Sequence, residues 1–249
     1  MRTLLVVLLV LLVVTALAVT RIPARLAIEQ LPAGPVQLVQ PAGTLWQGQA
    51  RLFLEGEALG LVSWDLDALA LGSLTLAVEL SLNGSAVDLS GPVQINRDQE
   101  VRFALDGSLG NALLVRVLAP YDIRIDGDLE LTGVRGAFAL PELLERIQLQ
   151  ALSGALAWDG GLTSYTLQNG TTTTQLPPLS AQLALTEERQ PEVEVYTPGV
   201  TYPVLFTSIT SEQFVKIGVT RRFTEIARMP WPGSEPDHAV VLEVEQQLF

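Results

Sequence analysis

Apolar and polar residues alternate with a period of two along most of the chain beyond residue 47. Residues 73–82 read SLTLAVELSL, and residues 121–131 read YDIRIDGDLEL. Successive side chains of a β-strand point to opposite sides, so these runs predict strands with one apolar and one solvated side. Strands of this kind are typical of antiparallel sheets. We therefore predict an all-β fold: an elongated, strongly curved, mostly antiparallel sheet with a few short helices.

Local signals refine this prediction. Asn83-Gly84 follows one alternating run and is typical of a type I′ hairpin, in which both central residues have positive φ. The alternation changes phase between residues 147 and 158, which predicts a β-bulge around Gly154. Short helices are expected at residues 141–146 and 220–229, whereas residues 111–118 fit either a strand or a short helix.

A weak internal repeat suggests two similar halves, at about residues 40–140 and 150–249. Residues 43–48 read GTLWQG, and residues 154–160 read GALAWDG, with glycine, leucine, tryptophan and glycine in the same order. An alternating strand follows each copy. The predicted globular part is therefore residues 21–249, with these two halves as its possible subdivision.

The beginning of the chain has a different character. Residues 3–20 contain no charged side chain and would span about 27 Å as a helix, enough to cross the apolar part of a bilayer. This segment is either a retained signal anchor or a cleaved signal peptide with Ala16-Leu17-Ala18 as its cleavage site. The long valine and leucine run favours a transmembrane helix over residues 1–20, and both alternatives place residues 21–249 outside the cytoplasm. The anchor residues are Leu4, Leu8, Leu12, Ala16 and Val19.

Composition narrows the function. Arg2 is the only charged residue before Arg21, so residues 21–249 hold 14 basic and 27 acidic residues, a net charge of −13. Such a surface repels phosphate groups, which argues against nucleic-acid binding. There is no cysteine, and His238 is the only histidine, placed in a predicted turn. The acids of residues 122–128 do not have the spacing of a calcium loop. We expect no catalytic residue, no metal and no cofactor.

Short glycine and tryptophan motifs resemble a known family. The segment GTLWQGQA contains Gly43, Leu45, Trp46 and Gly48, and a Leu-Gly pair precedes Trp64. The later motif contains Gly154 and Trp158, and Leu-Pro-Pro-Leu follows at residues 176–179. Together with the N-terminal apolar segment, these features resemble the type II secretion system protein N family. From the residues alone, the tryptophans are expected to cap the ends of an aliphatic core.

The resemblance implies a single-pass protein of the bacterial inner membrane with its C-terminal domain in the periplasm. It also implies an accessory or scaffold role in the machinery that carries folded proteins across the outer membrane. Other inner-membrane components of that machinery, and the membrane itself, would be the partners. A second interpretation is a periplasmic β-groove module whose apolar side binds a lipid or another hydrophobic ligand.

Overall fold

The computed structural model describes residues 21–30, 34, 36–67, 75–139, 149–167, 170–210, 214–229 and 231–247. The predicted transmembrane segment, with Leu4, Leu8, Leu12, Ala16 and Val19, lies outside these residues, and so does the helix expected at residues 141–146. In the described part of the chain, no helix has both the length and the apolar character needed to cross a membrane.

The fold is all-β and antiparallel, as the alternation predicts. Thirteen strands form one sheet in the order β1-β2-β3-β4-β5-β6-β8-β9-β12-β13-β14-β15-β16, and β11-β10-β7 form a second, small sheet. The strands are β1 Val36–Gly43, β2 Gln47–Leu54, β3 Glu57–Asp67, β4 Leu76–Asn83, β5 Val87–Ile95, β6 Glu100–Leu109, β7 Ile123–Ile125, β8 Leu129–Ala139, β9 Leu149–Trp158, β10 Gly161–Leu167, β11 Gly170–Leu176, β12 Leu179–Leu185, β13 Pro191–Tyr196, β14 Leu205–Ile209, β15 Phe214–Thr220 and β16 Val240–Gln247.

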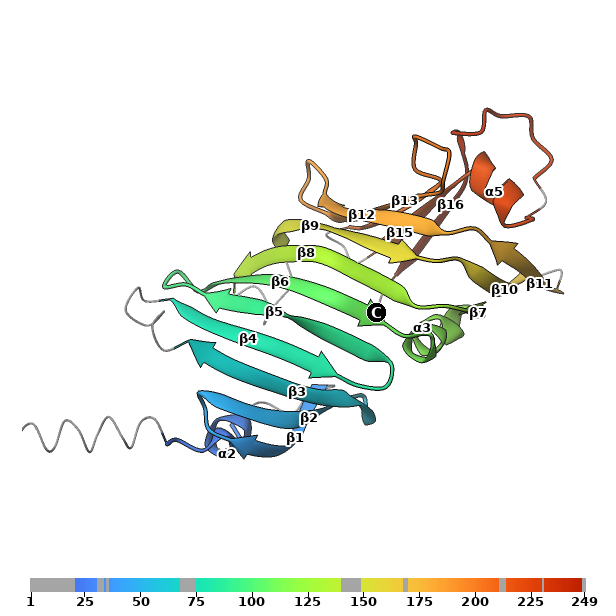
Figure 1. The fold of residues 1–249 in the computed structure, drawn as a ribbon. Helices are drawn as coiled ribbons and strands as arrows, with labels where there is room; N and C mark the ends of the chain where they lie inside the picture. Colours follow the sequence, from blue (N-terminus) through green and yellow to red (C-terminus); the bar gives the residue numbers. More distant parts are fainter. Residues whose placement is uncertain are drawn as a thin grey trace, which may run out of the picture.

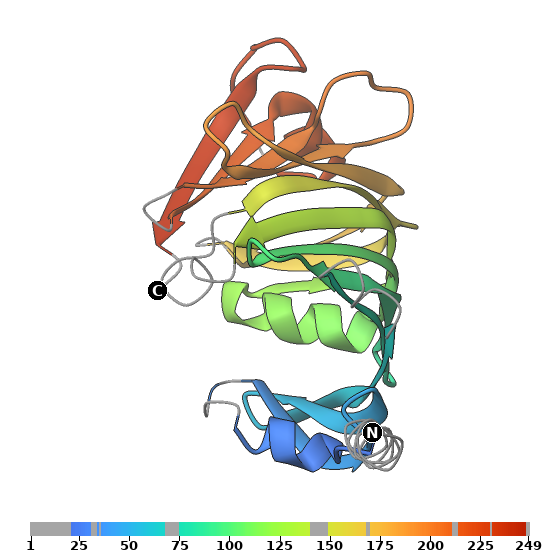
Figure 2. The same cartoon turned by 90° about the vertical axis from the view of Figure 1, so that its left-hand side faces the viewer.

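Among the described residues, few helices accompany the sheets. They are α2 Ala24–Ile28, α3 Asn111–Leu118, the 3₁₀ helix η2 Ala119–Tyr121 and α5 Arg221–Ile226. The ambiguous residues 111–118 are thus helical, and the helix expected within residues 220–229 is confirmed as α5. Figure 1 shows the large sheet extending as one elongated layer, and Figure 2 shows the curvature of its strands.

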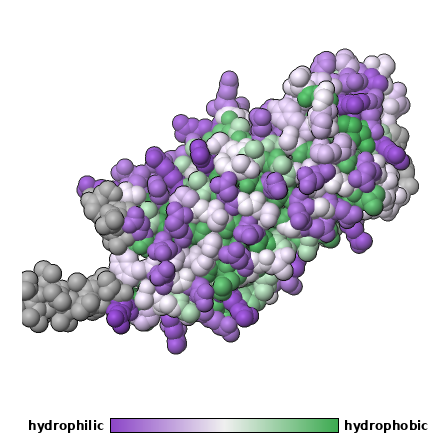
Figure 3. All heavy atoms as spheres, viewed as in Figure 1, coloured by the Kyte–Doolittle hydropathy of each residue, from purple (hydrophilic) through white to green (hydrophobic). Residues whose placement is uncertain are grey.

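The strand register places aliphatic residues in continuous rows across the large sheet. One row pairs from strand to strand without interruption, through Ala50, Val62, Leu82, Leu89, Gly107, Leu131, Leu156, Ala181, Val195, Leu205, Val219 and Leu242. Opposed residues of paired strands lie on the same side of a sheet, so this row forms one apolar side. Most of its members are half-buried. Figure 3 shows polar side chains spread over the face seen in Figure 1, with apolar ones between them.

A small core forms where the second sheet and α5 meet the large sheet. Trp158, Leu176 and Ala227 are buried there, and apolar residues of β7, β8, β12 and α5 pack against them. The indole Nε1 of Trp158 donates a hydrogen bond of 2.8 Å to the carbonyl of Asp126. The hydroxyl of Tyr165 donates to the carbonyl of Ala227 at 2.9 Å. These contacts attach the small sheet and α5 to the large one.

Two local predictions need correction, and a third is confirmed. The alternating run 121–131 is not one strand: β7 and β8 belong to different sheets, and Gly127 between them adopts φ +94. Asn83-Gly84 does end a strand of a hairpin, but neither residue has positive φ, so the turn is not of type I′. The bulge predicted where the alternation changes phase is confirmed, because β9 bulges at Gln150, where Leu149 pairs with Phe138 and Ala151 with Ala137.

The predicted boundary between two halves falls between β8 and β9. These strands pair with each other from Leu129↔Trp158 to Phe138↔Leu149, within the one large sheet. A second irregularity in this pair places two residues of β8, Gly133 and Val134, opposite Gly154. A Cβ atom on Gly154 would lie 2.7 Å from the Cα atom of Val134, so the close approach of the bulged strand requires glycine there.

Candidate functional site

The first family motif forms the tight turn between β1 and β2. The amide of Thr44 donates to the carbonyl of Gln47 at 2.8 Å, and the amide of Gln47 donates to the hydroxyl of Thr44 at 3.2 Å. Gly43 enters the turn with φ +90, and a Cβ atom there would lie 2.5 Å from the carbonyl oxygen of Gln47. Both the backbone conformation and the space therefore require glycine at this position.

Trp64 of β3 closes the turn from the side. Its indole Nε1 donates to the carbonyls of Thr44 and Leu45, at 3.3 and 3.2 Å. Trp64 pairs with Gly48, and a Cβ atom on Gly48 would lie 2.5 Å from Cζ2 of the indole. The second glycine of the motif thus leaves room for the ring. We call the unit formed by Gly43, Leu45, Trp46, Gly48 and Trp64 the glycine–tryptophan corner.

The corner also holds the segment that follows the apolar N-terminal run. The amide of Leu45 donates to the carbonyl of Ile22 at 2.8 Å, and Pro23 forms a β-bridge with Thr44. Ala24, the first residue of α2, is buried, and α2 contacts β1. On the other side, the amide of Leu66 donates to the carbonyl of Trp46 at 2.7 Å. Residues 22–24 are therefore joined to the end of the large sheet.

Sequence reasoning missed Ile22 and Pro23 as parts of this site. Their contacts to the corner are made by backbone groups, which any residue carries, so the hydrophobic pattern contains no sign of them. The proline after the apolar run was the one available signal, because proline often occurs where the chain enters a helix. Pro23 precedes α2 directly.

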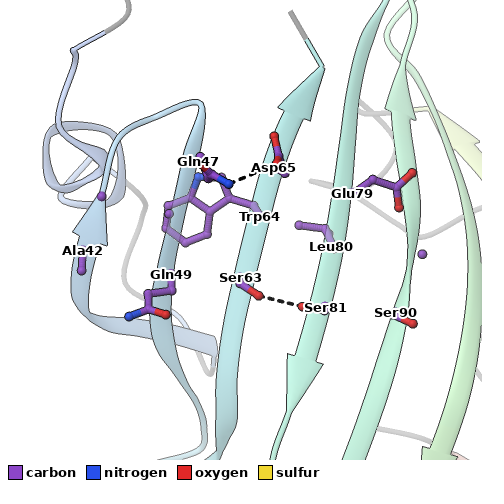
Figure 4. A pocket seen from close by; sticks show the side chains of 13 residues that line it. Ala42, Gln47, Gln49, Ser63, Trp64, Asp65, Glu79, Leu80, Ser81 and Ser90 are labelled. Atoms are coloured by element: carbon purple, nitrogen blue, oxygen red, sulfur yellow. Dashed lines mark hydrogen bonds between the residues drawn. The ribbon is translucent and has the colours of Figure 1, made fainter.

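An open hollow of about 640 Å³ lies beside the corner (Figure 4). Residues of β1 to β5 line it, among them Gln49, Trp64 and Leu80. The amide Nε2 of Gln47 donates to Oδ2 of Asp65 at 3.2 Å, and the hydroxyls of Ser63 and Ser81 are hydrogen-bonded at 2.7 Å. The lining contains two acids, Asp65 and Glu79, and no basic residue among the described residues. Such a surface offers hydrogen bonds and negative charge, without a nucleophile–base pair.

The later motif lies elsewhere in the sheet. Gly154 and Trp158 are both on β9, and Trp158 belongs to the small core with Leu176 and Ala227. Within the motif residues, the structure therefore brings together Gly43, Leu45, Trp46, Gly48 and Trp64 but not the pair on β9. Trp64 and Trp158 do share one feature, because each indole donates to a backbone carbonyl where the chain turns.

The ionisable residues singled out from the sequence have different partners. The exposed His238 has an edge-on contact with Tyr202, with ring centroids 5.9 Å apart. Oδ1 of Asp128 accepts a hydrogen bond from the amide of Asn111 at the start of α3, at 2.8 Å. Nearby in sequence to His238, the indole of Trp231 donates to Glu235 and lowers the pKa of that carboxyl. Within the described residues, no group of three or more histidines and acids could hold a metal ion.

Fold and corner together define a class: an all-β protein with one large antiparallel sheet, in which residues 22–24 are joined by backbone contacts to one end of that sheet. The chain belongs to the type II secretion system protein N family. The family model, described as type II secretion system (T2SS), protein N, matches residues 34–195, which include both glycine and tryptophan motifs. None of the curated proteins matches the chain, and no solved structure does. The chain is therefore a type II secretion component.

Proposed function

We propose that this protein is a membrane-anchored accessory component that supports the transport of folded proteins from the periplasm across the outer membrane. In this proposal residues 1–20 are a transmembrane helix of the inner membrane, and residues 21–249 form the periplasmic domain. Its partners are other inner-membrane components of the type II machinery. Family membership supports the general role, because it makes the chain a type II secretion component.

The observation that carries the anchored role is the attachment of residues 22–24 to the glycine–tryptophan corner. Ile22 directly follows Arg21 and the charge-free run of residues 3–20. Two backbone contacts, Leu45 to Ile22 and Thr44 to Pro23, join the exit of that run to β1 and β2. A helix held in the bilayer would thus set the position of the sheet relative to the membrane surface.

We further propose that the protein is not an enzyme. General acid–base and nucleophilic catalysis need groups within hydrogen-bond reach of one another. The exposed His238 is edge-on to a tyrosine ring, and of the two opposed acids of the hollow, Asp65 accepts a hydrogen bond from the amide of Gln47. This arrangement favours a role in which the protein contacts and positions other components of the secretion machinery.

A secretion assay tests the proposed function. In the bacterium that encodes the chain, deletion of its gene should lower the fraction of a type II substrate in the medium and raise the folded substrate in the periplasm. The wild-type chain supplied from a plasmid should restore secretion. Unchanged secretion after deletion, or substrate retained in the cytoplasm, would contradict the proposal.

The anchor needs a separate measurement. After extraction of membranes with alkaline carbonate, the protein should remain in the membrane fraction and keep its original N-terminus. A soluble form that begins at Val19 would show that residues 1–18 are a cleaved signal peptide instead.

One observation favours a second function, the binding of a lipid or another hydrophobic ligand. The aliphatic row that crosses the large sheet is mostly half-buried, so its apolar side is not sealed as in a two-layer core. The domain, exported with a cleavable signal and purified without detergent, should then carry lipid that mass spectrometry detects after solvent extraction. Val78→Asp on the apolar side should lower the bound lipid, whereas Gln94→Asp on the opposite side should not.

A further inference from the structure

The large sheet is open, so it has two edge strands, β1 and β16. An edge strand presents unpaired backbone N–H and C=O groups that can pair with another extended chain. Proteins usually protect such edges with proline, with irregular backbone or with a covering helix. The two edges of this sheet differ in every one of these respects.

The β1 edge is protected. Pro41 lies within the strand and has no amide hydrogen to donate. Its neighbour Gln40 adopts φ +55, and the register with β2 shifts between Val39 and Ala42. The helix α2 contacts β1 as well. These features make continuous pairing of a further strand with β1 unfavourable.

Among the described residues, the β16 edge has none of this protection over its main length. It contains no proline, and it pairs with β15 in an unbroken register from Val219↔Leu242 to Phe214↔Gln247. Among the described residues, no strand pairs with its other side. Leu242 and Val244 continue two apolar rows of the sheet, but they are 37% and 43% exposed, whereas the neighbouring Val219 is 6% exposed. The apolar side therefore ends with two residues that pair with β15 on one side and have no cross-strand neighbour on the other among the described residues.

The opposite side of β16 is acidic. Glu243 pairs with Gly218, which has no side chain, and Glu245 pairs with Lys216. Both glutamates are exposed. In an antiparallel pair, opposed residues lie on the same side, so a second copy of β16 in the central registers would place Glu243 opposite Glu243 or Glu245. Like charges directly opposite destabilise such a pair, which disfavours self-association through this edge.

We propose that the β16 edge binds an extended segment of a partner protein in which aliphatic residues alternate with lysine or arginine. The partner would add a fourteenth strand to the sheet. Its aliphatic side chains would cover Leu242 and Val244, and its basic side chains would face Glu243 and Glu245. Backbone hydrogen bonds would supply affinity, and the alternating side chains would supply specificity, as in other cases of strand addition.

The test uses the full chain purified in a neutral detergent and three fluorescent peptides as long as β16. One peptide repeats Val-Lys, one repeats Val-Glu, and the third has the Val-Lys composition with its lysines gathered at one end. Fluorescence anisotropy measures binding, and hydrogen exchange maps the amides that become protected. The Val-Lys peptide should bind about tenfold more tightly than the Val-Glu peptide and should protect β16.

Variants of the edge make the test specific. E243K/E245K should reverse the preference in favour of the Val-Glu peptide, and the nearly isosteric E243Q/E245Q should abolish it. The control E187K/E188K changes the net charge equally at two exposed residues between β12 and β13, and should keep the wild-type preference. Circular dichroism of each variant checks that the sheet is retained.

Four results would overturn the proposal. Equal binding of the Val-Lys peptide and its clustered counterpart would indicate a general attraction to an acidic protein. If the E187K/E188K control lost its preference for the Val-Lys over the Val-Glu peptide, this would also indicate a general attraction to an acidic protein. Absence of binding by every peptide up to about 1 mM would exclude strand addition of useful affinity. Protection of β16 that rises with protein concentration, without peptide, would show that a second copy occupies the edge.

Discussion

Replacing Gly48 with alanine should destabilise the glycine–tryptophan corner while the remainder of the sheet stays folded. The added Cβ would lie 2.5 Å from Cζ2 of Trp64 and 2.7 Å from the carbonyl oxygen of Ala42, so the indole has to move. Overpacking of this kind costs about 1–3 kcal/mol. A displaced indole would also lose its hydrogen bonds to Thr44 and Leu45, worth about 1 kcal/mol. The total, about 2–4 kcal/mol, is below the usual stability of a domain.

Urea unfolding and hydrogen exchange measure this effect. The unfolding midpoint of G48A should fall by about 1 M urea, and the amides of β1 to β3 should exchange faster than those of β8 and β9. Gly34→Ala is the matched control, because a Cβ atom there would have nothing within 4 Å. If G48A keeps the wild-type midpoint and exchange pattern, the corner is not held in the way described.

Three further predictions follow from other parts of the sheet. Val78→Asp should cost about 1–3 kcal/mol in urea unfolding, because it places an unpaired charge on the half-buried apolar side, whereas Gln94→Asp on the exposed side should cost less than about 1 kcal/mol. Trp158→Phe should lower stability by about 1–3 kcal/mol through the lost bond to Asp126 and the lost ring volume; an unchanged melting temperature would contradict the core assignment. His238→Ala should leave secretion unchanged, and a loss of secretion with normal folding would contradict the non-enzymatic role.

Strand phase was the feature most accessible from the sequence. The alternation of residues 73–82 assigns Leu76, Val78 and Leu80 to one side, and the register confirms this, since their pairs in β5 are Ile95, Val93 and Gly91. Period-two alternation has a direct physical cause in the pleat of a strand, so it survives without knowledge of the partners. The helix at residues 221–226 was recognisable for a similar reason, because its apolar residues recur at helical spacing.

Features set by contacts between distant residues were not accessible. The run 121–131 alternates throughout, yet Gly127 divides it between two sheets because β7 pairs with β10 and β8 pairs with β6. Gly84 reads as a turn residue, but its need for glycine comes from the backbone carbonyl of Leu59, which a Cβ atom would meet. The preference for Asn-Gly in type I′ hairpin turns concerns only the turn itself, so it cannot predict that another strand approaches the glycine closely.

For the motif residues too, part was accessible from the sequence and part depends on contacts between distant residues. Glycine and tryptophan in GTLWQG identified this segment as a motif from the sequence, and Gly43 and Gly48 do occupy sites with no room for a side chain. The partner of the motif, Trp64, was part of the resemblance, but its hydrogen bonds to Thr44 and Leu45 join β3 to the β1–β2 turn. The attachment of Ile22 and Pro23 uses backbone groups alone, so only the structure reveals it.

An exchange of the N-terminal segment tests the central claim, an anchored component of the type II machinery, most directly. In the deletion strain, residues 1–20 are replaced either by a cleavable signal peptide, which releases residues 21–249, or by an unrelated transmembrane helix of similar length. The measured quantity is the fraction of a type II substrate in the medium, at matched protein levels. We predict that the anchored version restores secretion and the released version does not. Full restoration by the released domain would contradict the account.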